Sequence, residues 1–141
     1  MTDSNKTLYA ALILRVTLGV LFLAHGLLKV LVFTPAGTAG FFESLGLPGL
    51  LAYLTIAGEL GGGAALILGL WTRWVSLALV PILVGAIVFA HGANGWLFSN
   101  QGGGWEYPAF WTIALIVQSL LGDGALALRQ PKSQLRLQTA S

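Results

Sequence analysis

Residues 12–32 read LILRVTLGVLFLAHGLLKVLV, and this stretch decides the class of fold. At about 1.5 Å per residue, a helix of this length extends roughly 31 Å, which matches the hydrocarbon core of a bilayer. The stretch nevertheless carries Arg15, His25 and Lys29. A basic side chain at the centre of a spanning helix disfavours insertion by about 2.5–3.5 kcal/mol. Because the three side chains share one face of a helix, we expect that face to point into a helix bundle.

The composition extends this expectation to the whole chain. Of 141 residues, 56% are hydrophobic and only 9% are charged, whereas soluble domains contain about 25% charged residues. The sequence therefore predicts an all-α integral membrane protein in contact with the lipid bilayer. It has no cysteine, which excludes disulfides, thiolate metal sites and iron–sulfur clusters on this chain. The net charge of +2 comes from few and dispersed basic residues, so nucleic acid is not an expected partner.

Four apolar blocks predict an antiparallel bundle of four transmembrane helices, formed by residues 1–128. A polar cytoplasmic tail is expected over residues 129–141, and a loop rich in turn residues is expected between the first two blocks. Pro81 is expected to kink the third block because it cannot donate a hydrogen bond to the carbonyl of Leu77. The blocks cover about residues 7–32, 48–70, 74–91 and 105–121.

The basic residues outside these blocks predict the orientation. If the helices alternate in direction, all of them lie on one side of the membrane, and the two loops on the other side contain no Lys or Arg. The positive-inside rule then places both termini in the cytoplasm, in the cell inner (plasma) membrane. The residues on the cytoplasmic side are Lys6, Arg73, Arg129, Lys132 and Arg136.

Glu59 is the expected partner of Arg15. It lies in the second block within IAGELGGG, where the neighbouring glycines allow a second helix to approach closely. Counted from the expected helix ends, Arg15 and Glu59 lie at similar depths in the bilayer. We therefore expect a buried Arg15–Glu59 ion pair between the first two helices. Such a pair serves either a function or only the packing and register of the helices.

A second polar cluster is expected towards the outer side of the membrane. His25 and Lys29 are candidate catalytic residues, and the candidate ligand-binding residues are His91, Trp105, Glu106 and Tyr107. Cationic donors, an imidazole, a carboxylate and a phenol beside tryptophans suit a ring-shaped ligand with polar oxygens, such as a quinone or a catechol-like phenol. Two alternatives stay open, because Lys29 can snorkel to the headgroups and His91 can be an ordinary interfacial histidine.

Other cofactors fit the sequence less well than a quinone. Ligation of haem by two histidines is disfavoured, because His25 is expected to lie several ångströms deeper than His91 and no CxxCH motif is present. The sequence contains no spacing typical of metal ligands, no hydrolase triad and no phosphate-binding loop.

Four motifs in order resemble the DoxX family. They are LRVTLGVLFLAHGLLKV at 14–30, FFESLGLPGLLA at 41–52, GELGGGAALILGLWTR at 58–73 and GGGWEYP at 102–108. The resemblance implies a small four-helix membrane protein, and family members are linked to thiosulfate:quinone oxidoreductase, to terminal oxidases and to quinone or catechol stress. The sequence departs from the family at GDGALAL, residues 122–128, where members often have Gly-Pro-Gly followed by a serine and an aspartate. By resemblance, the characteristic family positions are Arg15, His25, Lys29, Glu59, Glu106 and Tyr107.

Three functions compete on these grounds. The leading hypothesis is a membrane subunit of a quinone-linked redox system, which binds a quinone or similar aromatic ligand and supports a partner oxidoreductase that holds the redox cofactor. The second is a transporter or channel for a small solute, which would need a homo-oligomer because four helices are few. The third is a non-catalytic membrane scaffold whose buried charges are structural.

Overall fold

The apolar blocks fold as helices, and residues 2–129 are the part of the chain that the computed structural model describes. Helix α4 continues without a break into a π-helix, η1 (Ala86–His91), and a 3₁₀ turn, η2 (Gly92–Asn94). Over residues 2–129 the chain forms no β-strand. The α-helices are α1 (Asp3–Leu31), α2 (Pro35–Ser44), α3 (Leu50–Leu68), α4 (Thr72–Gly85) and α5 (Glu106–Leu121).

Helix α2 corrects the expectation of a loop between the first two blocks. The oxygen of the Thr34 side chain accepts a hydrogen bond from the backbone N–H of Gly37 at 3.1 Å, and Pro35 occupies the first turn. Both are start signals of a helix, because the hydroxyl caps a free N–H and proline has the backbone angle that a first turn requires. The glycines and the proline of this segment therefore begin a short helix and do not break one.

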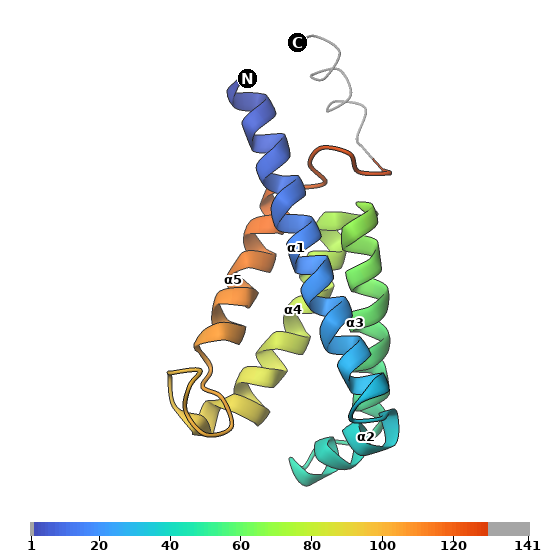
Figure 1. Ribbon diagram of the computed structural model, residues 1–141, viewed down its shortest axis with the longest axis vertical. Helices are drawn as coiled ribbons and strands as arrows, with labels where there is room; N and C mark the ends of the chain where they lie inside the picture. Colours follow the sequence, from blue (N-terminus) through green and yellow to red (C-terminus); the bar gives the residue numbers. More distant parts are fainter. Residues whose placement is uncertain (1, 130–141) are drawn as a thin grey trace.

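The long helices pack in two main pairs, α1 with α3 and α4 with α5, and α1 also contacts α5. Figure 1 shows α1 and α3 running side by side, with α4 and α5 to one side of them. Gly19 and Gly63 bring the backbones of α1 and α3 close together, since a Cβ added to Gly19 would lie 2.7 Å from the Gly63 carbonyl oxygen. Only glycine allows two helix backbones to approach so closely. A core cluster from all four helices lies beside this point: Leu18, Phe22, Leu66, Leu79, Leu83, Trp111 and Leu115.

The segment after α5 closes one end of the molecule. Its backbone N–H groups at Ala125 and Leu128 donate to the carbonyls of Leu8 and Leu68, both at 3.0 Å. The segment thereby joins the start of α1 to the end of α3. We call this the N-terminal end and the opposite end, which holds α2 and the loop before α5, the α2 end (Figure 1). The expected polar tail at 130–141 lies outside the described residues.

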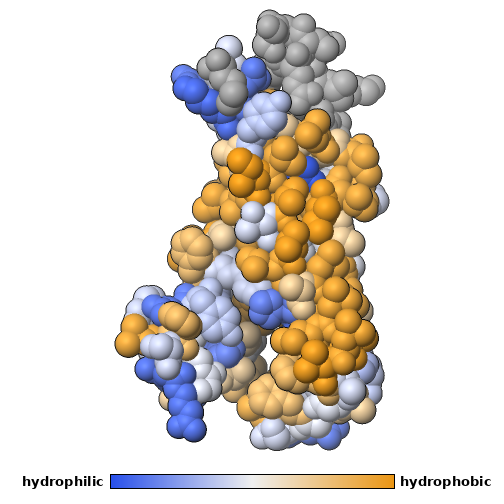
Figure 2. Space-filling model, viewed as in Figure 1, coloured by the Kyte–Doolittle hydropathy of each residue, from blue (hydrophilic) through white to orange (hydrophobic). Residues whose placement is uncertain are grey.

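The surface has the character of a membrane protein. Three helical segments are long and apolar enough to cross a bilayer, namely Asp3–Leu31, Leu50–Leu68 and Thr72–Asn94. Helix α5 has 16 residues and is shorter than these. On the face shown in Figure 2, hydrophobic residues cover most of the middle and hydrophilic residues gather near the two ends. Large apolar side chains that would be buried in a soluble protein are exposed, including Leu120 at 80% and Phe110 at 74%.

Candidate functional site

A cavity of about 980 Å³ lies at the α2 end, between the last turns of α1, α2, the first half of α3, and α4 with its π-helix. Figure 2 shows the surface hollowed at this end, beside the loop that precedes α5. Ligand pockets measure about 300–1,000 Å³, so the cavity has room for a large organic ligand. Most of its lining is apolar, and its polar lining residues are Lys29, Thr38, Thr55, Glu59 and His91.

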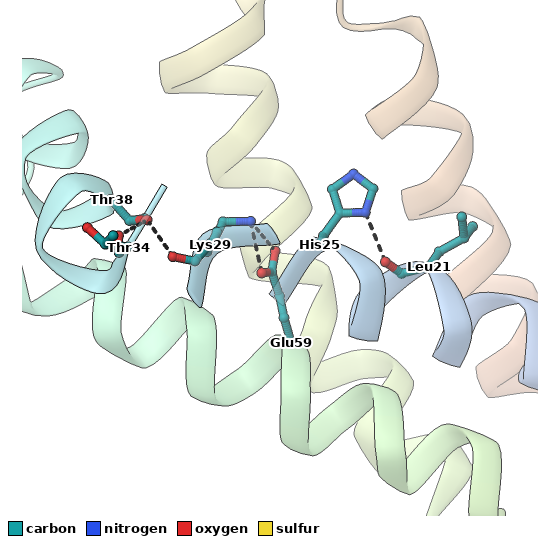
Figure 3. A network of polar contacts seen from close by, with 6 residues as sticks. All are labelled: Leu21, His25, Lys29, Thr34, Thr38 and Glu59. Carbon is teal, nitrogen blue, oxygen red and sulfur yellow. Dashed lines mark hydrogen bonds and ion pairs between the residues drawn. The ribbon is translucent and has the colours of Figure 1, made fainter. Parts of the chain in front are cut away.

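Lys29 and Glu59 form an ion pair in the wall of this cavity. The Lys29 ammonium donates to both carboxylate oxygens of Glu59, at 2.9 and 2.8 Å, and Figure 3 shows the two side chains pointing toward each other from α1 and α3. The side chains are 19% and 6% exposed, respectively. Lysine has three N–H donors, and within residues 2–129 only two of them have a partner. The third is available to a ligand in the cavity.

The packing of α1 against α3 determines which charges meet. A Cβ added to Gly26 would lie 3.3 Å from the Cβ of Glu59, and Lys29 follows Gly26 by about one turn of α1. Residues three apart in a helix share a face, so the Lys29 side chain reaches Glu59. Helix α1 also begins at Asp3 and not near residue 7. The depth of Arg15 in the bilayer, counted from the expected start of the helix, is therefore wrong.

The expected Arg15–Glu59 ion pair is wrong. Arg15 is fully buried and donates to three backbone carbonyls, those of Leu66 and Ile67 at 2.8 Å and that of Ala125 at 3.1 Å. The Gly19–Gly63 contact places Arg15, one turn away, beside the C-terminal end of α3. The last carbonyls of a helix lack partners within the helix and carry partial negative charge. Arg15 therefore clamps the end of α3 and the segment after α5, far from Glu59 along the bundle.

His91 occupies the rim of the cavity at the end of the π-helix. Its Nδ1 lies 3.0 Å from the carbonyl oxygen of Gly103, and its Nε2 lies 2.7 Å from the Tyr107 hydroxyl. A carbonyl only accepts, so Nδ1 carries the proton and, in the neutral ring, Nε2 accepts from the tyrosine. The expected meeting of His91 and Tyr107 is thus present, although Tyr107 itself does not line the cavity.

His25 does not join the cavity, which corrects part of the expected outer cluster. Its ring packs edge-on against Trp111 of α5, with centroids 4.9 Å apart, and Nδ1 contacts the Leu21 carbonyl at 2.9 Å. Figure 3 shows the His25 ring one turn of α1 away from the Lys29–Glu59 pair. His25 and Lys29 share a face of α1 because they are four residues apart, but the His25 ring contacts α5 and the Lys29 ammonium contacts α3.

Trp105 and Glu106 also lie outside the cavity lining. The Trp105 ring packs against Trp96 with centroids 4.5 Å apart, and a carboxylate oxygen of Glu106 accepts from the Phe98 backbone N–H at 2.8 Å. Both residues therefore hold the shape of the loop before α5. The expected ligand-binding set separates into a cavity residue, His91, its partner Tyr107, and these two loop residues.

Several cavity residues are not predicted by the sequence. Thr38 and Thr55 supply hydroxyls, and α2 adds a wall that the expected loop could not have provided. The signal for α2 is present in the sequence, because Thr34 and Pro35 together form a helix start. The aromatic lining residues Phe33, Phe41, Phe42 and Phe89 carry no such signal. In the part of the chain that the structure describes, no three His, Cys, Asp or Glu side chains gather as they would to hold a metal ion.

These features define a class, the small helical membrane protein with a charged pair in a largely apolar cavity. The sequence model of the DoxX family matches residues 10–92, which is more than half of the chain. The protein belongs to the DoxX family, a membrane family, and the resemblance seen in the sequence motifs is confirmed. The match includes Lys29, Glu59 and His91.

Three curated bacterial proteins are similar to this chain. "Putative oxidoreductase CatD" of Bacillus subtilis is 44% identical over 77 residues, which cover 55% of this chain and 56% of CatD. "Inner membrane protein YqjF" of Escherichia coli is 33% identical over 95 residues, covering 64% of this chain and 72% of YqjF. An uncharacterized protein of Haemophilus influenzae is 33% identical over 121 residues, covering 85% and 88%. No solved structure matches the chain.

Proposed function

We propose that the protein is a membrane subunit of a quinone-linked redox system, which binds a quinone or similar aromatic ligand in the cavity and supports a partner oxidoreductase. The observation that carries the proposal is the Lys29–Glu59 pair in the wall of an otherwise largely apolar cavity. Pockets for small ligands typically combine apolar walls with a few placed polar groups. The printed name of one relative, "Putative oxidoreductase CatD", supports a redox role.

The proposal includes an arrangement in the membrane. Helices α1, α3, α4 and α5 form an antiparallel bundle in the inner (plasma) membrane, with both termini in the cytoplasm. Lys6, Arg73 and Arg129 support this orientation, since they belong to the N-terminal end, and the positive-inside rule assigns such residues to the cytoplasm. The printed name of YqjF, an inner membrane protein, supports the location. The cavity then lies towards the outer side.

Each polar residue of the cavity has a distinct part in binding. A quinone bound there would accept two electrons and two protons reversibly, and the electrons would come from the partner oxidoreductase. The third N–H of Lys29 is the donor for a ligand oxygen, while Glu59 fixes the ammonium in place and accepts from a ligand hydroxyl. His91 borders the same space in a fixed tautomer, held by Gly103 and Tyr107.

The packing of the other half of the bundle favours a binding protein over a channel. The buried core cluster, which includes Phe22, Leu66 and Leu115, fills the space between the helices. Beyond it the Arg15 clamp holds together α1, α3 and the segment after α5. A channel needs a polar or hydrated path through these layers. Among residues 2–129, the cavity lining on α1 and α3 includes no residue nearer the N-terminal end than the Lys29–Glu59 pair.

Glycine substitutions test the proposal with little risk to the fold. A Cβ added to Gly85 meets nothing within 4 Å, and Gly85 lines the cavity, so the side chain of Gly85→Leu begins in open space beside the cavity. Gly61→Leu is the matched control, because Gly61 has equal space but does not line the cavity. The purified protein in lipid nanodiscs is titrated with a short-chain benzoquinone and a short-chain naphthoquinone, and binding is followed by tryptophan fluorescence and equilibrium dialysis.

We expect saturable binding of one of the two quinones to the wild type. Gly85→Leu should weaken it at least about tenfold, equivalent to about 1.4 kcal/mol, and Gly61→Leu should leave it unchanged. Absence of saturable binding to the wild type, or equal binding by the two variants, overturns the proposal. Solute flux through liposomes without any quinone binding would instead support the transporter hypothesis.

A further inference from the structure

Helices α3 and α4 separate progressively from the N-terminal end toward the α2 end, as Figure 1 shows. A Cβ added to Gly62 of α3 would lie 2.8 Å from the Leu79 side chain, and one added to Gly58 would lie 3.0 Å from Ile82. One turn further along α4, a Cβ at Gly85 meets nothing within 4 Å. The two helices therefore touch beside the core and leave a gap next to the cavity.

The residues at this gap line the cavity and are also exposed on the outer surface of the bundle. Leu54 of α3 is 59% exposed and Phe89 of the π-helix is 48% exposed, and both line the cavity together with the exposed Pro81. Counted from Thr72, Pro81 lies about 14 Å along α4 at roughly 1.5 Å per residue, which is the middle of a hydrocarbon core about 30 Å thick. By the same count Phe89 lies about 26 Å along this helix, so the opening extends from the middle of the hydrocarbon core toward its outer edge, where it faces lipid.

The polarity of the α3 wall changes along the cavity, while Thr38 and His91 add polar groups on other walls. On α3 the lining residues Leu51, Thr55 and Glu59 follow one another at intervals of one turn, so the wall changes from apolar to charged over about 12 Å. Glu59 is the lining residue of α3 nearest the N-terminal end, so its pair with Lys29 lies at that end of the α3 wall. A ligand that matches this gradient has a polar ring at the ion pair and an apolar portion directed away from it.

We infer that the gap between α3 and α4 is a lateral portal for an amphiphilic ligand, whose polar ring binds at Lys29–Glu59 and whose apolar tail leaves the protein between Leu54 and Phe89. The ligand is then a membrane-dissolved quinone with an isoprenoid tail and not a small water-soluble aromatic compound. This inference rests on the proposed function and adds the ligand class and the route of entry. The tail remains partly in the bilayer, so the cavity encloses mainly the ring and the first part of the tail.

Photo-crosslinking in nanodiscs tests the route. The probe is a quinone ring with a short isoprenoid tail that carries a diazirine, and a fatty alcohol with the same diazirine tail is the probe without a ring. Crosslinked positions are located by mass spectrometry of the digested protein. We expect the quinone probe to label Leu54, Phe89 and their neighbours, and a tail-less quinone in excess should remove at least about nine-tenths of this labelling by competing at the ion pair.

Two tryptophan variants then test whether the portal is needed. Leu54→Trp narrows the gap, while Leu68→Trp places the same side chain on α3 at an exposed position, 46% exposed in the wild type, that does not line the cavity. We expect Leu54→Trp to slow binding of the tailed quinone at least about fivefold and to slow binding of the tail-less quinone clearly less, since only the tailed ligand occupies the gap when it is bound. Leu68→Trp should change neither rate.

The outcomes separate the two proposals. If the tail-less quinone binds but the tailed probe labels the same lipid-facing positions as the fatty alcohol, the portal is overturned and the proposed function stands. If no quinone binds the wild type in any form, the proposed function fails and the portal fails with it. A phospholipid that copurifies at one molecule per chain and is lost in Gly85→Leu would also overturn the inference, because the cavity would then hold a structural lipid.

Discussion

The two ends of the molecule handle buried charge in opposite ways. At the N-terminal end the guanidinium of Arg15 is fully buried and, within residues 2–129, bonded only to backbone carbonyls. At the α2 end the ammonium of Lys29 is partly exposed, faces a cavity and retains a donor beyond its two bonds to Glu59. The comparison teaches that a charge inside a membrane bundle indicates function when it borders open space. Where the charge completes the backbone of a neighbouring element, it indicates structure.

The largest expected effect is the loss of the Arg15 clamp. Arg15→Met leaves the carbonyls of Ile67 and Ala125 without a donor and removes a third bond at Leu66. A hydrogen bond to a charged group contributes about 1.5–3 kcal/mol, so we expect the free energy of unfolding to fall by about 3–5 kcal/mol. Titration with sodium dodecyl sulfate, followed by circular dichroism, measures it. Arg73→Met at an exposed position of the same end is the control, and an equal loss in both variants would refute the clamp.

Replacing both Lys29 and Glu59 with apolar residues should largely preserve the free energy of unfolding but abolish ligand binding. Lys29→Met leaves the buried Glu59 carboxylate unpaired, and we expect a loss of about 3 kcal/mol. The double variant Lys29→Met/Glu59→Met should recover to within about 1 kcal/mol of the wild type, because a buried pair often stabilises no more than an apolar replacement. We expect neither variant to bind the quinone. Recovery of binding in the double variant would contradict the role of the pair.

The same measurement separates the observed pairing from the one that the sequence suggested. In a double-mutant cycle, Lys29 and Glu59 should show a coupling energy of about 2 kcal/mol. Arg15 and Glu59 lie at different levels of the α1–α3 contact, so the losses of their single variants should simply add. A coupling energy between Arg15 and Glu59 as large as that between Lys29 and Glu59 would refute the register described above.

The smallest expected effect concerns the rim of the cavity. Tyr107→Phe removes one neutral hydrogen bond to His91 and should lower the free energy of unfolding by about 1 kcal/mol. Because the Gly103 carbonyl still fixes Nδ1, ligand affinity should change by less than about threefold, equivalent to roughly 0.7 kcal/mol. Tyr53→Phe, at an exposed position of α3, serves as the control. A loss of affinity as large as that of Gly85→Leu would place Tyr107 in direct contact with the ligand.

The sequence predicted the helical blocks closely because length and hydropathy are local properties. The blocks at 7–32 and 48–70 contain most of α1 and all of α3, and the block at 105–121 exceeds α5 by one residue. Helix α2 was missed because its glycines are common in turns, although its capping threonine and first proline were visible. The family resemblance was also accessible, because it depends on the order of short motifs and on no contact in space.

The sequence by itself determined that this is a helical membrane protein and that its basic residues avoid lipid, because the cost of charge in hydrocarbon depends on residue type. Only the tertiary structure decided which partner each basic residue has. The Gly19–Gly63 and Gly26–Glu59 contacts fix the register of α1 against α3. This register places Arg15 beside backbone carbonyls at the end of α3 and Lys29 beside Glu59. The divergence of α3 from α4, which opens the cavity, likewise depends on contacts between the two helices. No single sequence motif contains both partners of these contacts.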